Sequence, residues 1–450
     1  MADRYEAGGA PGPAFDSSEP RPAAGGRIDS VDVLRGLTIL LMVFVNDLGP
    51  AAPAWMHHIE PPDADGMTLA DVVFPAFLFL VGVSIPLAFE RAQAAGKSKG
   101  AQLVHVLTRT AGLLLMGVIE LNGADDQTLG RPWWRALAYT ALILAWCALP
   151  RERGRKRSVV FAAKALGVAG LLVLLAVYRQ QPAPTEFPFW GRVEGWTWMR
   201  TGWWGILGLI GWAYLTVGLI VLLLGWRREW LTGALALLIA LHLAFKHGGL
   251  FTRVADKPWL GPDALDVLAA LARGVDAVGR YVGLGDATGS LAAVTMAGCL
   301  LGTILRRDSN VTTPRARLSW ALTFAAGLLL AGFVTDTFEG INKIKATPTW
   351  CLWCAGLTCL AWVVFYMLVD VSNFRAWSAP IRAAGANALV AYFLHPIVLG
   401  LVSLTGFGST VLAYKQSSDS WVVIGGSLGM AAFVCAVAGL LGRLGLRMRL

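Results

Sequence analysis

The chain has few charged residues, which make up only 15% of its 450 positions. Soluble domains carry about a quarter charged residues, so this scarcity argues against a soluble globular protein. The hydrophobic residues, at 56%, occur in blocks rather than at the amphipathic spacing of a soluble helix. Because about 20 consecutive apolar residues cross a bilayer core as a helix, the blocks predict an integral membrane protein.

Cysteine is also scarce, and its six residues all fall in apolar segments. Cys351 and Cys354 form a C-x-x-C pair inside a predicted spanning helix, with no second pair at the spacing of a zinc site. We therefore expect the thiols to pack in the interior, with no disulfide framework and no metal site. Residues 1–26 lack the apolar core of a cleavable signal peptide and predict a disordered tail.

Residues 27–450 predict one all-α domain, a polytopic bundle of about 12 spanning helices. Each span must be helical, because lipid offers the backbone no hydrogen-bond partners. Two spans are short or weakly apolar, so the range is 10–12. The predicted spans are 31–48, 68–90, 102–121, 132–149, 158–178, 203–225, 229–246, 287–305, 317–335, 348–371, 382–404 and 421–442.

The net charge of +9 would suggest nucleic acid in a soluble protein. Here the basic residues gather in every second loop, as in PRERGRKR at 150–157, while 49–67 has no Lys or Arg. Basic loops face the cytoplasm, so both termini are predicted to be cytoplasmic and 49–67 to be external. We expect membrane lipid as a partner and no nucleic acid.

Two predicted external segments are long. Residues 179–204 are rich in tryptophan, which is typical of an interfacial belt, and a sugar-stacking platform is the alternative. Residues 247–286 contain an amphipathic stretch at 263–281 that we expect on the membrane surface or on the bundle. No internal repeat is evident, which argues weakly against an inverted-repeat transporter.

The first predicted span begins with two opposite charges. Asp32 and Arg35 are spaced to meet across one helical turn. This spacing indicates a local ion pair at the cytoplasmic end, and the alternative is an anion site in which Arg35 takes part.

The same span ends on the external side with Asn46 and Asp47, and the loop that follows carries His57 and His58. Histidine is the side chain best suited to take a proton from an amine or hydroxyl near neutral pH. An asparagine amide could orient it or hold a carbonyl oxygen. A solvated, idle loop histidine is the simpler reading, so the spacing makes these residues catalytic candidates only.

Three further segments carry polar residues at the ends of predicted spans or within them. Thr68 and Asp71 have the spacing of a helix-capping box, which explains Asp71 without a catalytic role. The segment 332–350 closes an external hairpin with several polar residues, and a solvated loop is the simpler reading. The late span places Asn387 and His395 in an apolar helix, where polar groups suggest an internal cavity or bonds between helices.

Four motifs resemble the heparan-α-glucosaminide N-acetyltransferase family and its bacterial relatives, which are transmembrane acyltransferases. The resemblance is densest over 27–91, returns over about 332–398 and is weak between them. The motifs are SVDVLRGLTILLMVFVND, DGMTLADVVFPAFLFLVGVSIPLAF, GINKIKATPTW and GANALVAYFLHP.

The resemblance implies transfer of acetyl from cytosolic acetyl-CoA, as the acyl-donor substrate, to a sugar amine or hydroxyl across the membrane. It places the family's catalytic histidine in the loop that holds His58 and His57, with His58 favoured by position. It also places the family's motif asparagine on Asn46, its motif aspartate on Asp71 and its late polar pair on Asn387 and His395. We expect catalysis to involve Asn46 and Asp71, donor binding to involve Arg35, Asp32, Asn387 and His395, and acceptor binding to involve Asp47, Asn342 and Lys343.

The tail is short beside the large lumenal region of the animal enzyme, so a glycan or amino sugar in general is the expected acceptor, rather than heparan sulfate. A bacterial inner membrane is the expected location, and a homo-oligomer is left open. Two rival readings remain at this point. One is a transporter for a small polar solute, and the other is a non-catalytic glycan-binding subunit that uses 187–204 as its platform.

Overall fold

The structure is a computed structural model that describes residues 28–148, 157–187, 191–246 and 261–448. Several predicted features therefore lie outside the described residues. These are the tail 1–26, nearly all of the basic loop 150–157 and the first part of the external segment 247–286.

Every predicted span is helical. The corresponding helices are α1 (Asp29–Asp47), α2 (Leu69–Ala94), α3 (Lys99–Asn122), α4 (Arg131–Trp146), α5 (Arg157–Val177), α6 (Gly205–Leu224), α7 (Arg228–Lys246), α9 (Leu291–Ile304), α10 (Pro314–Glu339), α11 (Pro348–Phe365), α13 (Ala388–Ser403) and α15 (Ser420–Arg443). Shorter or peripheral helices are η1 (Ala54–Met56), α8 (Pro262–Val282), η4 (Asp286–Ser290), η5 (Tyr366–Val371), η6 (Ala376–Ser378), α12 (Ala379–Gly385), α14 (Gly408–Val411) and η7 (Ala413–Gln416).

Nine helical stretches in the described part of the chain are long and apolar enough to cross a membrane. A tenth span results if α12 and α13, which meet at a bend of 80°, count as one broken crossing. The helix α4 has only 16 residues, and α1 contains Asp32, Arg35 and Asp47. The protein is thus a multi-helix membrane protein, while twelve spans and their orientation stay predictions.

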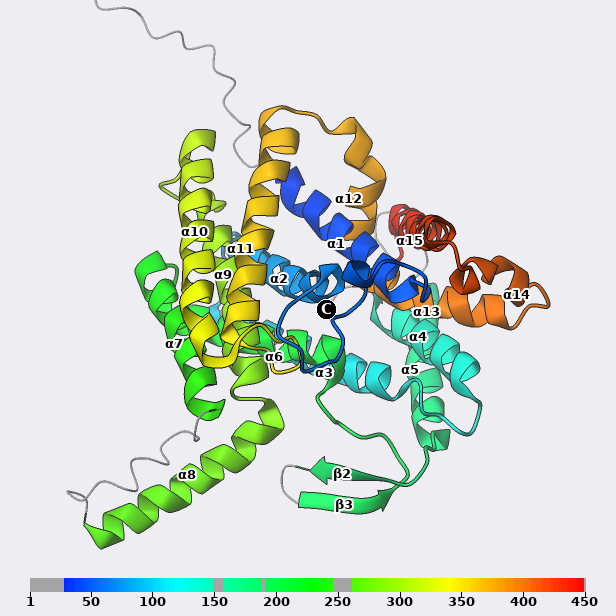
Figure 1. Cartoon of the computed structure of the whole chain (residues 1–450), viewed down its shortest axis with the longest axis horizontal. Helices are drawn as coiled ribbons and strands as arrows, with labels where there is room; N and C mark the ends of the chain where they lie inside the picture. The colour runs from blue at the N-terminus through cyan, green and yellow to red at the C-terminus, as the bar shows by residue number, and fades with distance from the viewer. Residues whose placement is uncertain (1–27, 149–156, 188–190, 247–260, 449–450) are drawn as a thin grey trace, which may run out of the picture.

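The helix α9 lies at the centre of the bundle, and all of its residues are buried. It packs on α2, α6, α7 and α11 (Figure 1). A Cβ atom on Gly82 would lie 1.9 Å from the carbonyl oxygen of Thr295, and one on Gly298 would lie 1.9 Å from that of Phe79. Small residues therefore allow the backbones of α2 and α9 to touch.

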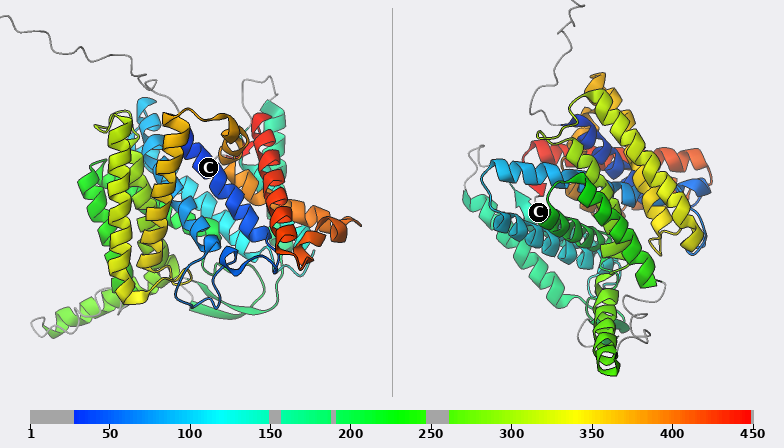
Figure 2. Two further views of the ribbon diagram at one scale, coloured as in Figure 1. Left: turned by 45° about the horizontal axis from the view of Figure 1, so that its top comes forward. Right: turned by 90° about the vertical axis from the view of Figure 1, so that its left-hand side faces the viewer.

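The loops sort to two ends of the bundle as the charge pattern predicts. At one end, Ile341 N donates to Asp65 at 2.7 Å, joining two loops that were predicted to be external. At the opposite end, Arg228 donates to Asn310 at 2.9 Å, joining two loops that were predicted to be cytoplasmic. Figure 2 shows the loop after α1 at the same end as α8 and the strands β2 and β3.

The prediction of an all-α chain misses a small β-hairpin. The strands β2 (Ala183–Phe187) and β3 (Gly191–Trp196) pair antiparallel in the tryptophan-rich segment that was predicted to be external. Because this segment lies beyond the spans, strand pairing and water satisfy its backbone, and the helical rule of the bilayer core does not apply there. A second, minimal pair joins β1 (Cys147–Ala148) to β4 (Arg447–Met448).

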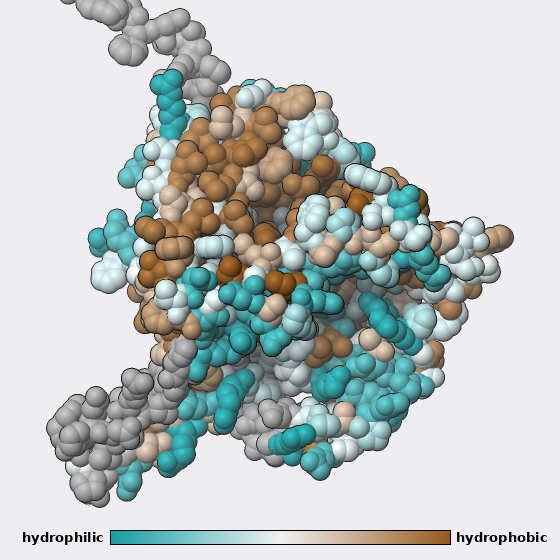
Figure 3. All heavy atoms as spheres, in the orientation of Figure 1, coloured by the Kyte–Doolittle hydropathy of each residue, from teal (hydrophilic) through white to brown (hydrophobic). Residues whose placement is uncertain are grey.

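The surface separates into apolar and polar regions. In Figure 3, hydrophobic atoms gather over α10, α11 and α12, and polar atoms gather over the loops and hairpin at the predicted external end. On α10, Leu330 and Phe333 leave 65% and 67% of their surface exposed, as expected for side chains that face lipid. All six cysteines are buried free thiols, which confirms their predicted packing role.

Candidate active site

His58 lies in the loop between α1 and α2 and meets a buried carboxylate. Its Nδ1 atom is 2.8 Å from Asp71 Oδ1. Asp71 is fully buried, whereas the His58 side chain leaves 51% of its surface exposed. Since an ionised carboxylate only accepts, we assign the Nδ1 proton to His58, which makes Nε2 the proton acceptor, with Lys343 Nζ at 3.3 Å. This histidine–acid pair has the arrangement of a general base held by an orienting acid.

Asp71 also begins the helix α2. Its Oδ2 atom accepts hydrogen bonds from the backbone N–H groups of Thr68 and Ile59, each at 3.1 Å. The capping box predicted from the sequence is therefore confirmed. The same carboxylate uses one oxygen to cap the helix and the other to hold His58, so two roles meet in one residue.

Lys343 completes a three-residue cluster from the loop between α10 and α11. Its Nζ atom lies 2.9 Å from His58 Nδ1, 3.3 Å from His58 Nε2 and 3.5 Å from Asp71 Oδ1. Burial lowers the pKa of the Lys343 ammonium below its ordinary value, and the charge of Asp71 partly opposes this shift. An ammonium group at this distance can stabilise negative charge that develops beside the imidazole.

Asn342 fastens the Lys343 loop to the His58 loop. Its Nδ2 atom donates to the carbonyl oxygens of Pro62 at 3.1 Å and Ala64 at 3.2 Å. The Asn342 side chain is buried, so water cannot replace these bonds. Asn342 was predicted to contact acceptor, and the structure places it as the joint between the two loops.

The substitution Asn342→Ala is expected to lower the free energy of unfolding by about 1–3 kcal/mol, because two backbone carbonyl groups lose a buried donor. Hydrogen exchange of residues 58–66, followed by mass spectrometry, should become faster. The control is Asn310→Ala, since Asn310 is exposed at the opposite end of the bundle. Unchanged exchange in the Asn342 variant would show that this side chain does not hold the loops together.

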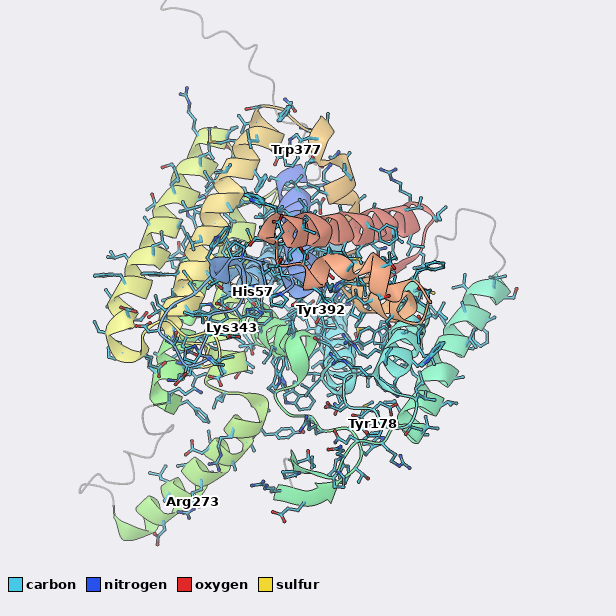
Figure 4. All side chains as sticks on the ribbon, turned by 45° about the vertical axis from the view of Figure 1, so that its right-hand side comes forward. His57, Tyr178, Arg273, Lys343, Trp377 and Tyr392 are labelled. Carbon is cyan, nitrogen blue, oxygen red and sulfur yellow. The ribbon has the colours of Figure 1, made fainter. Side chains whose placement is uncertain are left out.

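His57 and His58 have different surroundings. The His57 Nε2 atom is buried and has no hydrogen-bond partner among the described residues. The backbone carbonyl of His57 accepts a bond from Thr68, so its main chain supports the loop. Figure 4 shows His57 and Lys343 in the same region of the molecule. Of the two histidines, only His58 is paired with an acid in the described structure, which favours His58 for chemistry.

Asp47 forms a second polar cluster at the end of α1 that was predicted to be external. Its fully buried carboxylate accepts from His395 at 3.0 Å, Lys415 at 2.6 Å and Tyr414 at 2.5 Å. His395 was predicted beside the donor, and the structure joins it to the residue predicted for the acceptor. Asn46, the preceding residue, is exposed and forms no side-chain hydrogen bond with the described residues.

Asn387 lies at the break between α12 and α13, away from His395. Its Nδ2 atom donates to the carbonyl oxygens of Ala438 at 3.0 Å and Leu446 at 3.1 Å. These bonds tie the break to the end of α15. Since both donated bonds go to backbone carbonyls, the local geometry is that of a packing residue, and its predicted contact with the donor is not tested.

The predicted pair at the start of α1 is present. Arg35 Nη1 lies 3.0 Å from Asp32, and Arg35 Nη2 donates to Ser84 on α2 at 2.7 Å. The guanidinium is only 23% exposed, so it lies between α1 and α2 rather than in open solvent. An anion could reach its exposed edge, and the existing bonds would orient it.

The sequence reasoning missed an acid near the end of α3. Glu120 on α3 accepts a hydrogen bond from the Tyr392 hydroxyl on α13. A lone acid in an otherwise apolar helix was the signal that could have identified it. Tyr392 also lines a central cavity of about 10 Å³ between α1, α2, α6 and α13, which has room for about one water molecule.

A second missed cluster supports the Lys343 loop. His242 on α7 is fully buried, and its Nε2 lies 2.8 Å from Glu339 at the end of α10. Ser290 donates to the carbonyl of Ala346 at 2.6 Å and lies 3.0 Å from His242 Nδ1. Within the described residues, no group of three or more His, Cys, Asp or Glu side chains has the arrangement of a metal site.

Comparisons with known proteins find one matching family model and two similar proteins. A family model described as a domain of unknown function (DUF5009) matches residues 27–132, which contain α1, His58 and Asp71. The heparan-alpha-glucosaminide N-acetyltransferase of Mus musculus is 38% identical over 116 residues, or 26% of this chain and 17% of the mouse protein. The Homo sapiens protein of the same name is 38% identical over 108 residues, or 24% of this chain and 15% of the human protein.

These matches confirm the resemblance that was predicted from the motifs. The chain is related to the heparan-alpha-glucosaminide N-acetyltransferases over about a quarter of its length. The matched region covers less than a fifth of each relative.

Proposed function

We propose, from this kinship and from the His58 cluster, that the chain is a transmembrane acetyltransferase. Residues 27–450 would form one membrane domain with both termini in the cytoplasm, in the inner membrane of a bacterium. Acetyl would pass from cytosolic acetyl-CoA to an amine, or a hydroxyl, of an extracytoplasmic sugar. The observation that carries the proposal is the oriented His58–Asp71 pair beside Lys343.

In the proposed reaction, the acceptor nitrogen attacks the thioester carbonyl, and His58 Nε2 takes the proton that the nitrogen loses. Asp71 stabilises the resulting imidazolium through its bond to Nδ1. The Lys343 ammonium stabilises the oxyanion of the tetrahedral intermediate. The carbon–sulfur bond then breaks, the proton passes to the CoA thiolate, and the products are an acetamide and CoA.

The donor must cross the closed centre of the bundle to reach His58. The cavity of about 10 Å³ there cannot hold a pantetheine arm, so donor binding must separate α1, α2, α6 and α13. Arg35 is proposed to hold a donor phosphate at the cytoplasmic end of this path. Glu120 and Tyr392 lie beside the cavity and would have to part as the arm enters.

The proposal is tested with purified protein in liposomes, with labelled acetyl-CoA added only on the side of the predicted cytoplasmic face. Labelled acetyl should appear on a glucosamine acceptor that is present only on the opposite face. Acetyl-CoA should also raise the melting temperature, because a ligand at 100 times its Kd adds about 2.7 kcal/mol to the free energy of unfolding. Uptake of acceptor without donor and without acetylation would instead identify a transporter.

The substitution Lys343→Met is expected to lower the rate of acetyl transfer by about 10²–10³-fold, because the oxyanion of the tetrahedral intermediate loses the cation proposed to stabilise it. Initial rates from labelled acetyl-CoA measure the loss. The control is Lys345→Met, because Lys345 is exposed on the same loop. A Lys343 variant that is as fast as the Lys345 variant would show that Lys343 does not stabilise the intermediate.

A further inference from the structure

The predicted external end contains a cavity separate from the His58 cluster. Its volume is about 470 Å³, within the range of small-molecule sites. It lies where the hairpin β2–β3 faces the end of α8 beside the bundle (Figure 1). The lining residues are Leu121, Pro184, Thr185, Arg192, Arg200, Thr201, Gly202, Trp203, Arg280 and Tyr281.

The described side chains that line this cavity carry charge of one sign. Arg192, Arg200 and Arg280 are among them, and none of the described lining side chains is acidic. Arg200 is paired with Asp125 at 3.2 Å but leaves 42% of its side chain exposed. Arg192 and Arg280 are exposed and form no ion pair with any side chain that the structure describes. Because guanidinium groups stay charged at every physiological pH, the cavity attracts anions, and carboxylate or sulfate groups fit their paired donors.

The tryptophans of this segment divide into two kinds. The indole N–H groups of Trp196, Trp198 and Trp204 donate to backbone carbonyls of Met199, Leu175 and Tyr281, so these rings anchor the loop. Trp203 lines the cavity, is 51% exposed and forms no hydrogen bond within the described structure. An open indole face beside cationic groups suits the apolar face of a sugar ring.

We propose that this cavity binds an acidic saccharide, with its acid groups on Arg192, Arg200 and Arg280 and a sugar ring on Trp203. Thr185 and Thr201 supply hydroxyl groups for the sugar's own hydroxyls. The saccharide can be a soluble glycan or the head of a glycolipid, because both present the same chemistry. The inference does not rest on the proposed acetyl transfer, since binding at this cavity requires no reaction at His58.

The test measures binding of a hyaluronan tetrasaccharide to the full-length protein in detergent by isothermal titration calorimetry. This ligand carries carboxylates but no free amine, so it cannot serve as an acceptor for N-acetylation. The neutral ligand for comparison is chitotetraose. The acidic tetrasaccharide should bind about tenfold more tightly or better, as expected for about 1.4 kcal/mol or more from charge-assisted bonds.

The double variant Arg192→Gln/Arg280→Gln should lose about tenfold in affinity for the acidic ligand or more. The matched control is Arg273→Gln, because Arg273 is exposed on α8 but does not line the cavity; Figure 4 shows its place on that helix. Trp203→Ala should weaken binding of both ligands. Melting temperatures near that of the parent protein would show that the variants are folded.

Several outcomes would overturn the inference. Equal affinity for the acidic and neutral tetrasaccharides would remove the role of the arginines. Equal losses in the Arg273 control and the double variant would indicate general charge attraction. Inorganic sulfate that binds as tightly as the tetrasaccharide would indicate an anion site without sugar recognition. Displacement of the tetrasaccharide by phosphatidylglycerol nanodiscs, but not by phosphatidylcholine nanodiscs, would indicate a phospholipid headgroup site.

Competition by an acidic glycolipid, without competition by phosphatidylglycerol, would support the glycolipid source.

Discussion

Replacing His58 with glutamine is expected to reduce acetyl transfer by about 10²–10⁴-fold, which is the usual contribution of a general base. Glutamine retains a donor for Asp71 but offers no group that can accept a proton from an amine. Initial rates from labelled acetyl-CoA, with donor and acceptor both saturating, measure the loss in the chemical step. Binding of acetyl-CoA, followed by its effect on melting temperature, should persist because His58 lies at the opposite end of the bundle from the predicted donor phosphate site.

The matched control for this prediction is His57→Gln, one residue away. Its rate should stay within a few-fold of the parent protein, since His57 has no acid partner among the described residues. A severe loss in the His57 variant, with little loss in the His58 variant, would reverse the assignment. Trapping of acetyl on the parent protein, in the absence of acceptor, would replace the general-base step with a covalent acetyl-enzyme.

The substitution Gly82→Ala is expected to abolish the folded protein or to destabilise it by about 3 kcal/mol or more. The added Cβ would lie 1.9 Å from the backbone carbonyl oxygen of Thr295, and a backbone atom cannot turn aside as a side chain can. The helices α2 and α9 would have to separate, which would break one of the two most extensive helix contacts in the described structure. Gly298→Ala should behave alike, because its Cβ would meet Phe79 in the same way.

Gly327→Ala provides the control for the glycine prediction. Gly327 lies in α10, and no heavy atom stands within 4 Å of the position of its added Cβ. Alanine should therefore be neutral there, or slightly stabilising through its better helix propensity. Fluorescence-detected size-exclusion chromatography after a heat step measures all three variants. A Gly82 variant as stable as the Gly327 variant would show that α2 and α9 do not approach so closely.

The sequence predicted the helices well because the bilayer leaves few alternatives. All twelve predicted spans coincide with helices, and the amphipathic stretch 263–281 is the helix α8. The hairpin β2–β3 was missed because the external segment lies outside the bilayer, where no rule forces a helix. The bend of 80° between α12 and α13 was also missed, because hydropathy measures the apolar length of a segment and not its direction.

The site was predictable where its residues are close in sequence. Thr68 and Asp71 form the capping box, and the pairing of Asp71 with His58 joins residues 13 positions apart. The Asp47–His395 bond spans 348 positions, so it depends on how the helices assemble. Asp47 and His395 were both noticed as polar residues in or near spans. Their partnership could not be inferred, because spacing along one chain reveals only neighbours on the same helix.

The shared use of Asp71 has a consequence for how this protein changes through evolution. One carboxylate oxygen sustains the beginning of α2, and the other orients His58, so selection on folding alone would retain the acid. His58 receives no such protection, since half of its side chain is exposed and it caps nothing. A descendant that abandons the reaction should therefore keep aspartate at position 71 while position 58 drifts. Among sequences of this kind, histidine at 58 would mark the active lineages, and aspartate at 71 would mark only ancestry.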